Sequence, residues 1–522
     1  MADMSGEWAS SQQPAEGGRG SGGKSRGLLI GAVALGVLLL GASAAFTFQA
    51  LSGGGSQPDS AMPAGALGFA RVDLDPSADQ KINAVRLLRR VPEFEQTTGI
   101  SSDRDDLRKK IYEAVVEDAE ESGTAEDCPD YKDGVEPWLG DRVGFGAMPA
   151  EDSEEPDGLV AVQVSDQDAA KDGIEKLAAC GGESSVGVAF VGDYALIAET
   201  QQLADDFAAD AEESPLSENA DYLADMDAAG GSGIVSGWAN VEALIDESLN
   251  EEERVTAEAF GLGRTTSIAM AMSAGSDSLE FAVAANGEAL TDGSGTTSFA
   301  ELPASTMFGF GFTGGSELVQ KGWEQAQKSL EGNESFDAQE LADMVQAETG
   351  FVVPDDVATL FGDDFVLAMD AEAVELGPTG EPDPSTVRVG MRTSSDLAEI
   401  QVLTTRLESA LAAAAPVDLI ERESDRGTVV AATEEYADAL ADEDGLADSA
   451  NYRAAVADHD SATAVFFMDF DLMLKFVDDL GEQNSDPMSA DERKTFEVLR
   501  AFGVSGARDG DYTLATVRLV FD

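Results

Sequence analysis

The chain has 522 residues, which is room for two or three domains, and 43% of them are hydrophobic, which excludes a disordered protein. Its charge is unusual, because 101 acidic residues face 32 basic ones and the net charge is −69. A surface this negative repels phosphate backbones, so we exclude nucleic-acid binding as a main function. The sequence contains one histidine, His459, which excludes any mechanism that needs two.

The first element in chain order is an apolar stretch at residues 27–51, which carries no charge and is long enough to cross a membrane. The polar, glycine- and serine-rich residues 1–26 before it include Arg19, Lys24 and Arg26. Positive charge stays on the cytoplasmic side of a membrane. The sequence therefore predicts a disordered cytoplasmic tail followed by a single-pass transmembrane helix.

We expect the rest of the chain, after a linker at residues 52–62, to lie outside the cell and to stay attached to the cell membrane. The alternative is a cleaved signal peptide, because Ala42-Ser43-Ala44 resembles a cleavage site. The long N-terminal region and the apolar residues that continue past Ala44 favour the retained anchor.

The extracytoplasmic part contains the same series of sequence blocks twice, in the same order, which chance rarely produces. The repeat predicts two homologous halves, copy one at residues 63–285 and copy two at residues 303–522, joined by a linker at residues 286–302. We expect Trp138, Gly140, Tyr222 and Trp238 to correspond to Leu360, Gly362, Tyr452 and Phe467. The matched blocks are Met62–Ala64 with Leu302–Ala304, Gln80–Lys81 with Gln320–Lys321, Trp138–Met148 with Leu360–Met369, Leu216–Tyr222 with Leu446–Tyr452, and Gly233–Val241 with Thr463–Phe470.

Hydrophobic periodicity within each half predicts more β-hairpins than β-α-β crossovers. This pattern favours an α+β fold with mainly antiparallel sheets and packed helices. Strands are expected at residues 66–72, 143–148, 159–164, 186–191, 195–198, 267–273, 279–285, 306–312, 504–507 and 513–520, and helices at residues 82–91, 107–115, 169–179 and 317–330.

Two glycine motifs resemble nucleotide-binding loops. Gly18–Ser25 fits the phosphate-loop pattern, but no strand precedes it and the predicted membrane helix follows. Gly309–Gly314 fits GxGxxG, but the repeat places Phe69 and Arg71 at the first two glycines, where a side chain would keep a phosphate away. We therefore predict a strand and a turn there, and neither a nucleotide nor a cofactor.

The sequence around these blocks resembles a known family. The residues that carry the resemblance are Pro63–Pro76, Pro137–Val143 (PWLGDRV, the most specific part) and Ser217–Tyr222, which is repeated at Asp448–Tyr452. They resemble a bacterial, actinobacterial-type family of single-pass, membrane-anchored envelope proteins that is defined as a domain of unknown function. The resemblance implies an anchored, extracytoplasmic, duplicated domain, and it brings no activity, substrate or catalytic residue with it.

Cys128 and Cys180 are the two cysteines of the chain. An even number of cysteines outside the membrane favours a disulfide, and two free buried thiols are the alternative. Copy two has no cysteine, so we interpret the predicted bond as a local staple. A nucleophilic cysteine is disfavoured because copy one has no histidine to activate it.

No residue pattern identifies a catalytic or metal site. His459 lies between Asp458 and Asp460 and is interpreted as a loop residue, since no serine elbow accompanies it. The carboxylates of Asp73–Asp79 and Asp442–Asp444 lack the spacing and the glycine of an EF-hand. The many acidic pairs allow a glycosidase-like dyad without locating one.

One basic cluster interrupts the acidic sequence, and we interpret it as a source of ordinary salt bridges. It could instead face lipid or an acidic protein. We expect a non-enzymatic envelope ectodomain that binds or scaffolds another component. The alternatives are a carboxylate-dependent envelope hydrolase and a carrier that holds an apolar ligand between the two halves. The cluster comprises Lys81, Arg86, Arg89, Arg90, Arg104, Arg108, Lys109 and Lys110.

Overall fold

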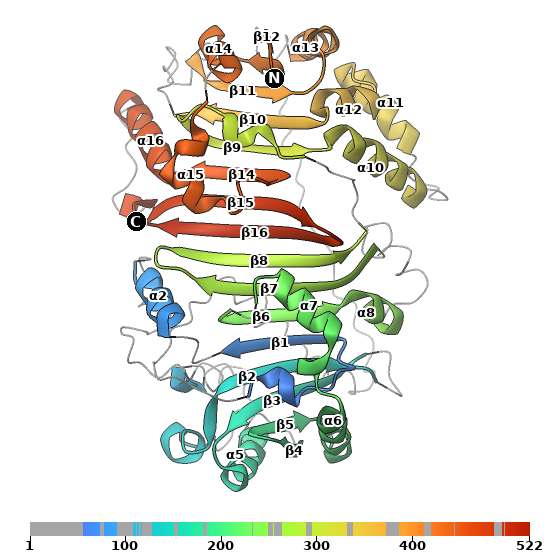
Figure 1. Ribbon diagram of the computed structural model, residues 1–522, viewed down its shortest axis with the longest axis vertical. Helices are drawn as coiled ribbons and strands as arrows, with labels where there is room; N and C mark the ends of the chain where they lie inside the picture. Colours follow the sequence, from blue (N-terminus) through green and yellow to red (C-terminus); the bar gives the residue numbers. More distant parts are fainter. Residues whose placement is uncertain are drawn as a thin grey trace, which may run out of the picture.

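The computed structural model shows one extended sheet with helices packed on both of its faces (Figure 1). The predicted anchor at residues 27–51 lies outside the described residues, as does the phosphate-loop match at Gly18–Ser25. The structure describes residues 56–73, 78–90, 108–110, 112–113, 116, 128–150, 155–180, 185–231, 233–248, 254, 264–288, 295–330, 338–371, 386–411, 419–442, 444–484, 493–494 and 496–522. Within these ranges, no helix is both long and apolar enough to cross a membrane.

The sheet has 16 strands, and each hydrogen-bonded pair is antiparallel. This confirms the prediction of an α+β fold built on antiparallel strands. The strand order is β12-β13-β11-β10-β9-β14-β15-β16-β8-β7-β6-β1-β2-β3-β5-β4. The strands are β1 (Gly68–Asp73), β2 (Leu139–Met148), β3 (Asp157–Val164), β4 (Gly187–Val191), β5 (Tyr194–Ala198), β6 (Val235–Asn240), β7 (Thr265–Ala274), β8 (Ser278–Gly287), β9 (Thr306–Thr313), β10 (Asp364–Asp370), β11 (Val389–Thr393), β12 (Ile420–Ser424), β13 (Gly427–Ala431), β14 (Ala464–Asp469), β15 (Leu499–Asp509) and β16 (Tyr512–Phe521).

The strand order reads the same from the middle of the sheet to either edge. Outward from the centre, the first half runs β8, β7, β6, β1, β2, β3, β5, β4, and the second half runs β16, β15, β14, β9, β10, β11, β13, β12. The two halves meet where β8 pairs with β16, from Ser278 opposite Val520 to Asn286 opposite Tyr512. The backbone ladder is therefore continuous across the junction.

Helices pack on both faces of this sheet. Figure 1 shows α7 and α15 crossing in front of the strands, with α2 and α16 along one margin and α8 and α10 along the other. The helices are η1 (Pro58–Ala61), α2 (Ala78–Leu88), η2 (Tyr131–Val135), α5 (Gln167–Cys180), α6 (Gln201–Glu213), η3 (Leu216–Glu218), α7 (Ala220–Ala228), α8 (Val241–Ser248), η5 (Ser298–Glu301), α10 (Gly315–Leu330), α11 (Ala338–Thr349), α12 (Asp355–Phe361), α13 (Leu397–Leu411), α14 (Glu434–Asp442), η7 (Leu446–Asp448), α15 (Ala450–Ala455) and α16 (Phe470–Asn484).

The largest core of the first half lies between the sheet and α6 and α7. Successive side chains of a strand point to opposite faces, so Phe69, Leu159 and Trp238 reach the same side and are buried there. Tyr222 of α7 packs edge-on against Trp238, with ring centroids 5.6 Å apart. Such edge-to-face pairs add to the stabilisation that burial provides.

The second half has a core in the matching place, between the sheet and α14 and α15. Tyr452 of α15 packs edge-on against Phe467, with ring centroids 5.3 Å apart. Gly309 leaves room for the ring of Phe299, because a Cβ at Gly309 would lie 3.0 Å from that ring. The glycine motif at Gly309–Gly314 is thus part of β9 and the turn before α10, as predicted, and Gly309 serves packing.

The predicted disulfide is present and joins Cys128 to Cys180, at the end of α5. It fixes α5 beside η2, and Trp138 is buried between these two elements. Gly173 of α5 permits this contact, because a Cβ there would lie 2.2 Å from the indole nitrogen of Trp138. The disulfide therefore fixes the two elements that surround Trp138, and both cysteines of the chain take part in it.

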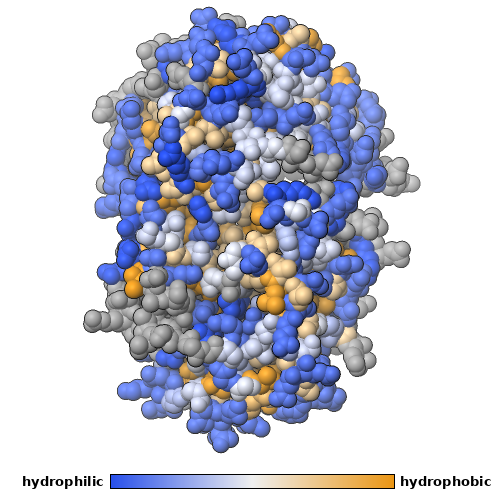
Figure 2. All heavy atoms as spheres, in the orientation of Figure 1, coloured by the Kyte–Doolittle hydropathy of each residue, from blue (hydrophilic) through white to orange (hydrophobic). Residues whose placement is uncertain are grey.

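The face seen in Figure 2 is mostly hydrophilic over the helices, with paler and more hydrophobic residues along its middle. The acidic excess is spread over this surface rather than gathered in one tail. Charges of one sign repel one another across such a surface, and dissolved salt screens that repulsion.

Candidate functional site

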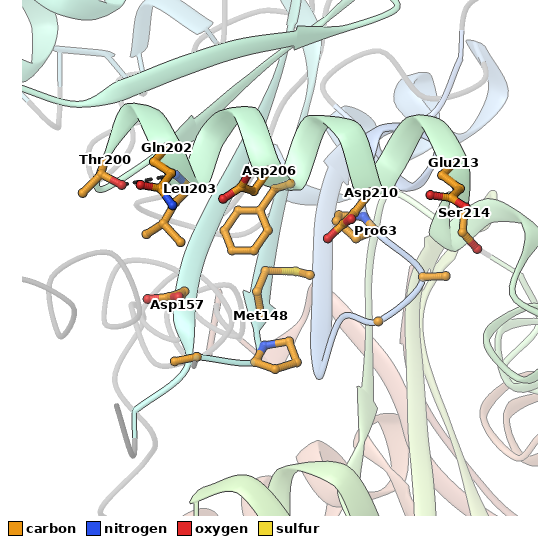
Figure 3. Close-up of a pocket in the computed structure, with 15 residues that line it drawn as sticks. Pro63, Met148, Asp157, Thr200, Gln202, Leu203, Asp206, Asp210, Glu213 and Ser214 are labelled. Atoms are coloured by element: carbon orange, nitrogen blue, oxygen red, sulfur yellow. Dashed lines mark hydrogen bonds between the residues drawn. The ribbon is translucent and has the colours of Figure 1, made fainter. Parts of the chain in front are cut away.

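A cavity of about 820 Å³ opens beside α6 in the first half of the sheet (Figure 3). Cavities of this size accommodate small organic ligands or a short stretch of peptide. It lies among three parts of the chain, namely the segment before β1, the β2–β3 turn and α6. The residues that line it are Pro63, Ala64, Gly65, Met148, Pro149, Ala150, Asp157, Thr200, Gln202, Leu203, Asp206, Phe207, Asp210, Glu213 and Ser214.

The local sequence explains why α6 presents an apolar side to this cavity. The helix begins after Thr200, whose hydroxyl accepts a hydrogen bond from the backbone N–H of Leu203 at 3.2 Å. Leu203 and Phe207 are four residues apart and therefore lie on the same side of the helix. With Met148 from β2, they form an apolar floor.

Three carboxylates of the same helix line the cavity beside this floor. Asp206, Asp210 and Glu213 are spaced at four and three residues, which places them in one row along α6. Figure 3 shows Asp206 and Asp210 on the side of α6 that faces Met148. Asp157, at the start of β3, adds a fourth carboxylate from across the cavity. The lining therefore combines apolar surface with negative charge, and none of its described residues is basic.

The proton affinity of Asp157 is perturbed. Partial burial raises the pKa of its carboxyl group, and the nearby negative charge of Glu199 raises the pKa further. Both causes disfavour the ionised form, so a cation placed beside Asp157 would relieve an electrostatic cost. Perturbed groups that lie in a cavity are candidates for ligand binding or acid–base chemistry.

The sequence analysis did not single out these residues. The row of acids at Asp206, Asp210 and Glu213 was the available signal, but an acidic row on a helix usually marks a solvated surface. What distinguishes this row is that Met148 and Asp157 lie opposite it, and only the pairing of β2 with β3 brings those two residues together.

The other residues considered from the sequence lie away from this cavity. His459 lies in a turn, where its Nε2 is 3.6 Å from Asp460 and its ring packs edge-on against Tyr452. Asp73 forms a buried ion pair with Arg142 at 3.5 Å. Among the described residues, no group of three or more His, Cys, Asp or Glu side chains is arranged to hold a metal ion.

Three described members of the basic cluster, Arg108, Lys109 and Lys110, form ion pairs of the kind that we expected. Arg108 lies 3.4 Å from Asp141, and Lys109 and Lys110 each lie within 3.5 Å of Glu113. These pairs are partly exposed, so each contributes little to stability.

A second apolar surface lies at the junction of the halves, on the sheet face opposite α7. Phe281 is 39% exposed, and Val283 beside it and Val517 across the ladder are partly exposed. Alternation along β8 places these side chains away from Ala284, which belongs to the core beneath α7. The junction thus has a closed backbone ladder and a partly exposed apolar face.

Comparison of the sequence with protein-family models and with curated proteins found no match. The functional interpretation therefore depends on the geometry of the two surfaces described above.

Proposed function

We propose that this chain is a membrane-tethered, extracytoplasmic binding protein of the cell envelope, of the kind that its resemblance to the actinobacterial-type family implies. The observation that carries the proposal is the α6 cavity, which combines an apolar floor with a row of carboxylates. Binding sites for small ligands are concave and mostly apolar, with a few polar groups that fix orientation.

We further propose that the ectodomain arose by duplication, so that its two halves are homologous. The repeated strand order supports this proposal, because unrelated halves have no reason to share it. The registers support it as well. Trp238 pairs with Phe69 in the first half, and Phe467 pairs with Gly309 in the second, which keeps the correspondence expected from the sequence.

The aromatic and glycine pairs agree with the same correspondence. Tyr222 packs on Trp238 as Tyr452 packs on Phe467. Gly140 lies against Gln163, and Gly362 lies against Ser394 at the equivalent end of the neighbouring strand. Such shared packing and turn geometry is what duplication preserves first, whereas ligand sites diverge. A binding site is therefore expected in one half alone.

The anchor remains a sequence-based part of the proposal, and the start of the described chain indicates how close to such an anchor the first half would lie. Ser56 lies five residues after the end of the apolar stretch, and its carbonyl accepts a hydrogen bond from the hydroxyl of Tyr194 at 2.8 Å. The first half would therefore be held close to the membrane. Protease added to intact cells should remove everything after about residue 52. Protection, or release of an intact ectodomain by leader peptidase, would contradict the tether.

Ligand binding at α6 is tested by purifying the full chain from membranes in mild detergent and identifying bound small molecules by native mass spectrometry. Gly65→Phe should displace the ligand, because Gly65 lines the cavity and a Cβ there meets no atom within 4 Å. Gly322→Phe is the matched control, since its Cβ also meets open space but lies on α10. Equal ligand occupancy in both variants would remove the α6 site from the proposal.

The junction favours a second candidate, the carrier of an apolar ligand between the halves. Its supporting observation is the partly exposed face that includes Phe281 and Val517. Phe281→Asp should then abolish binding of a neutral fluorescent lipid, while Gly65→Phe should leave it unchanged. The reverse result would favour the α6 cavity. The remaining alternative, a carboxylate-dependent hydrolase, requires that the protein turn over a substrate. Binding at either of the two sites does not require turnover.

A further inference from the structure

The backbone ladder gives residues of the α6 cavity counterparts in the second half. Met148 pairs with Asp157 across β2 and β3. At the matching place, the backbone N–H of Asp370 donates to the carbonyl of Arg388 at 3.0 Å. Asp370 therefore corresponds to Met148, and Arg388 corresponds to Asp157.

The helix caps extend this correspondence to α6 and α14. Thr200 accepts a hydrogen bond from the N–H of Leu203, and Thr433 accepts one from the N–H of Tyr436, both at 3.2 Å. Leu203 therefore corresponds to Tyr436.

In the second half, a cation of the protein itself occupies this place. The guanidinium of Arg388 lies 3.5 Å from a carboxylate oxygen of Asp370 and 2.8 Å from one of Glu435. The hydroxyl of Ser305 donates to the same Asp370 oxygen at 2.9 Å. Tyr436 is fully buried beside them. In the second half, this place is thus filled by polar side chains that are hydrogen-bonded or ion-paired to one another, and one of them, Arg388, is positively charged.

In the first half, the corresponding positions carry smaller or apolar side chains and an acid. Leu203 is smaller than Tyr436, and Gly65 leaves open space where the second half has Ser305. These truncations leave the cavity of about 820 Å³. The corresponding pairs, second half first, are Ser305 with Gly65, Asp370 with Met148, Arg388 with Asp157, Glu435 with Gln202, Tyr436 with Leu203 and Ala439 with Asp206.

The replacements also reverse the charge at the centre of the site. Asp157, which carries a carboxylate, corresponds in the strand pairing to Arg388, which carries a guanidinium, and Asp206 adds a second negative charge where Ala439 has none. The first half therefore has the space and the acids for a cation, and none of the described residues that line the cavity supplies one. Met148 and Phe207 supply an apolar surface for the chain that bears that cation.

We propose that the α6 cavity binds an organic cation in which a guanidinium or ammonium group is attached to a short apolar chain. The cation would lie beside Asp157 and Asp206, and its apolar chain would contact Met148 and Phe207. Such a group reproduces in the first half what Arg388 provides in the second. Charge-assisted hydrogen bonds to carboxylates supply the specificity. This inference rests on the proposed binding function and on the proposed homology of the halves.

The test is calorimetric titration of the purified full chain with agmatine, which carries a guanidinium and an ammonium group at the two ends of a four-carbon chain, and with N-butylurea, which has the same chain length and neither charge. We expect agmatine to bind and N-butylurea to bind at least about tenfold more weakly, since a charge-assisted hydrogen bond is lost. Asp157→Asn should weaken agmatine binding by about tenfold or more. Asp168→Asn removes the same charge from an exposed position of α5 and should leave it unchanged.

Met148→Asp combined with Asp157→Arg rebuilds the second-half ion pair inside the cavity and should abolish agmatine binding. A peptide, acetyl-Gly-Arg-Gly-amide, separates the two sources of such a cation. Tighter binding of the peptide assigns the site to an arginine of a partner protein, and tighter binding of agmatine assigns it to a free cation.

Equal binding of agmatine and N-butylurea, or equal weakening by Asp157→Asn and Asp168→Asn, would overturn the proposed ligand class. If no probe binds but a native ligand is lost from Gly65→Phe, the cation is wrong and the binding function stands. If that native ligand is also absent, the binding function fails with it.

Discussion

Arg388→Ala provides the sharpest test of how the second half fills the position that is open in the first. The Arg388 side chain is 15% exposed and pairs with Asp370, whose side chain is 2% exposed, and with Glu435, whose side chain is 78% exposed. The Asp370 carboxylate also accepts a hydrogen bond from the Ser305 hydroxyl at 2.9 Å, and removing the guanidinium takes away the positive charge that Arg388 provides beside it. Because removing one partner of a buried ion pair is costly, the variant should be markedly less stable.

The magnitude follows from burial. Breaking a buried ion pair by removing one partner costs about 3–5 kcal/mol, whereas an exposed pair such as that with Glu435 contributes about 0–1 kcal/mol. Water can approach through the exposed edge of Arg388, and Ser305 remains, so we expect about 3 kcal/mol. For a cooperative unit of the size of the second half, that loss of stability lowers the melting temperature by about 6–12 °C.

The assay is unfolding in urea together with thermal unfolding of the full chain. Guanidinium chloride is unsuitable because its cation could occupy the vacated position. Arg422→Ala is the matched control, since Arg422 pairs with Glu434 and Asp438 at 3.4 and 3.1 Å but all three side chains are at least 35% exposed. We expect it to cost less than about 1 kcal/mol.

A double variant identifies the cause. Adding Asp370→Met to Arg388→Ala removes the Asp370 carboxylate, which has lost the charge of Arg388. The double variant should recover a large part of the lost stability, because the two residues interact directly. A loss of stability from Arg388→Ala no larger than that from Arg422→Ala would contradict the role of the buried ion pair. Additive effects of Arg388→Ala and Asp370→Met on the free energy of unfolding would contradict it as well.

Further predictions concern the disulfide, the buried tyrosines, Asp157 and the acidic surface. Replacing Cys128 and Cys180 by serine should lower the free energy of unfolding by about 4 kcal/mol, from closure of a loop whose ends are 52 residues apart, as measured by urea unfolding. Tyr222→Phe should cost about 1–2 kcal/mol, because its hydroxyl donates to Asp59 at 3.1 Å, whereas Tyr452→Phe should cost almost nothing, because its buried hydroxyl has no hydrogen-bond partner among the residues that the structure describes. Equal effects would argue against this difference between the halves. Asp157→Asn should leave stability unchanged at pH 3 and raise it at pH 7. The reason is that the carboxyl group of Asp157 has a raised pKa in the folded protein, so its protonated form favours the folded state, and this contribution is lost as the pH rises through the folded pKa. Melting temperatures measured over a pH series test this prediction, and a lower stability of the variant at pH 7 would contradict it. Stability should rise between low salt and about 0.5 M salt, since screening weakens the repulsion that a net charge of −69 creates, and a flat response would mean that the charges are locally paired.

The local pattern of the chain was sufficient to predict most of the elements around the site. The alternation at residues 143–148 and 159–164 predicted β2 and β3, and the runs at residues 186–191 and 195–198 predicted β4 and β5, between which Gly192 adopts a φ of 59°. These features depend on residues close together in sequence. Cys128 and Cys180 could be paired because the chain has no other cysteine.

Only the tertiary structure decided that the strands form one sheet of 16 and that β8 joins β16. Each half ends in a hairpin with a free edge, and a sequence pattern does not state which other edge will satisfy those backbone hydrogen bonds. The cavity was decided at the same level, because Met148 and Asp157 reach α6 through strand pairing. Asp157 and Arg388 lie far apart in the sequence, and only the strand pairing shows that each lies beside the last residue of a neighbouring strand, Met148 in one case and Asp370 in the other.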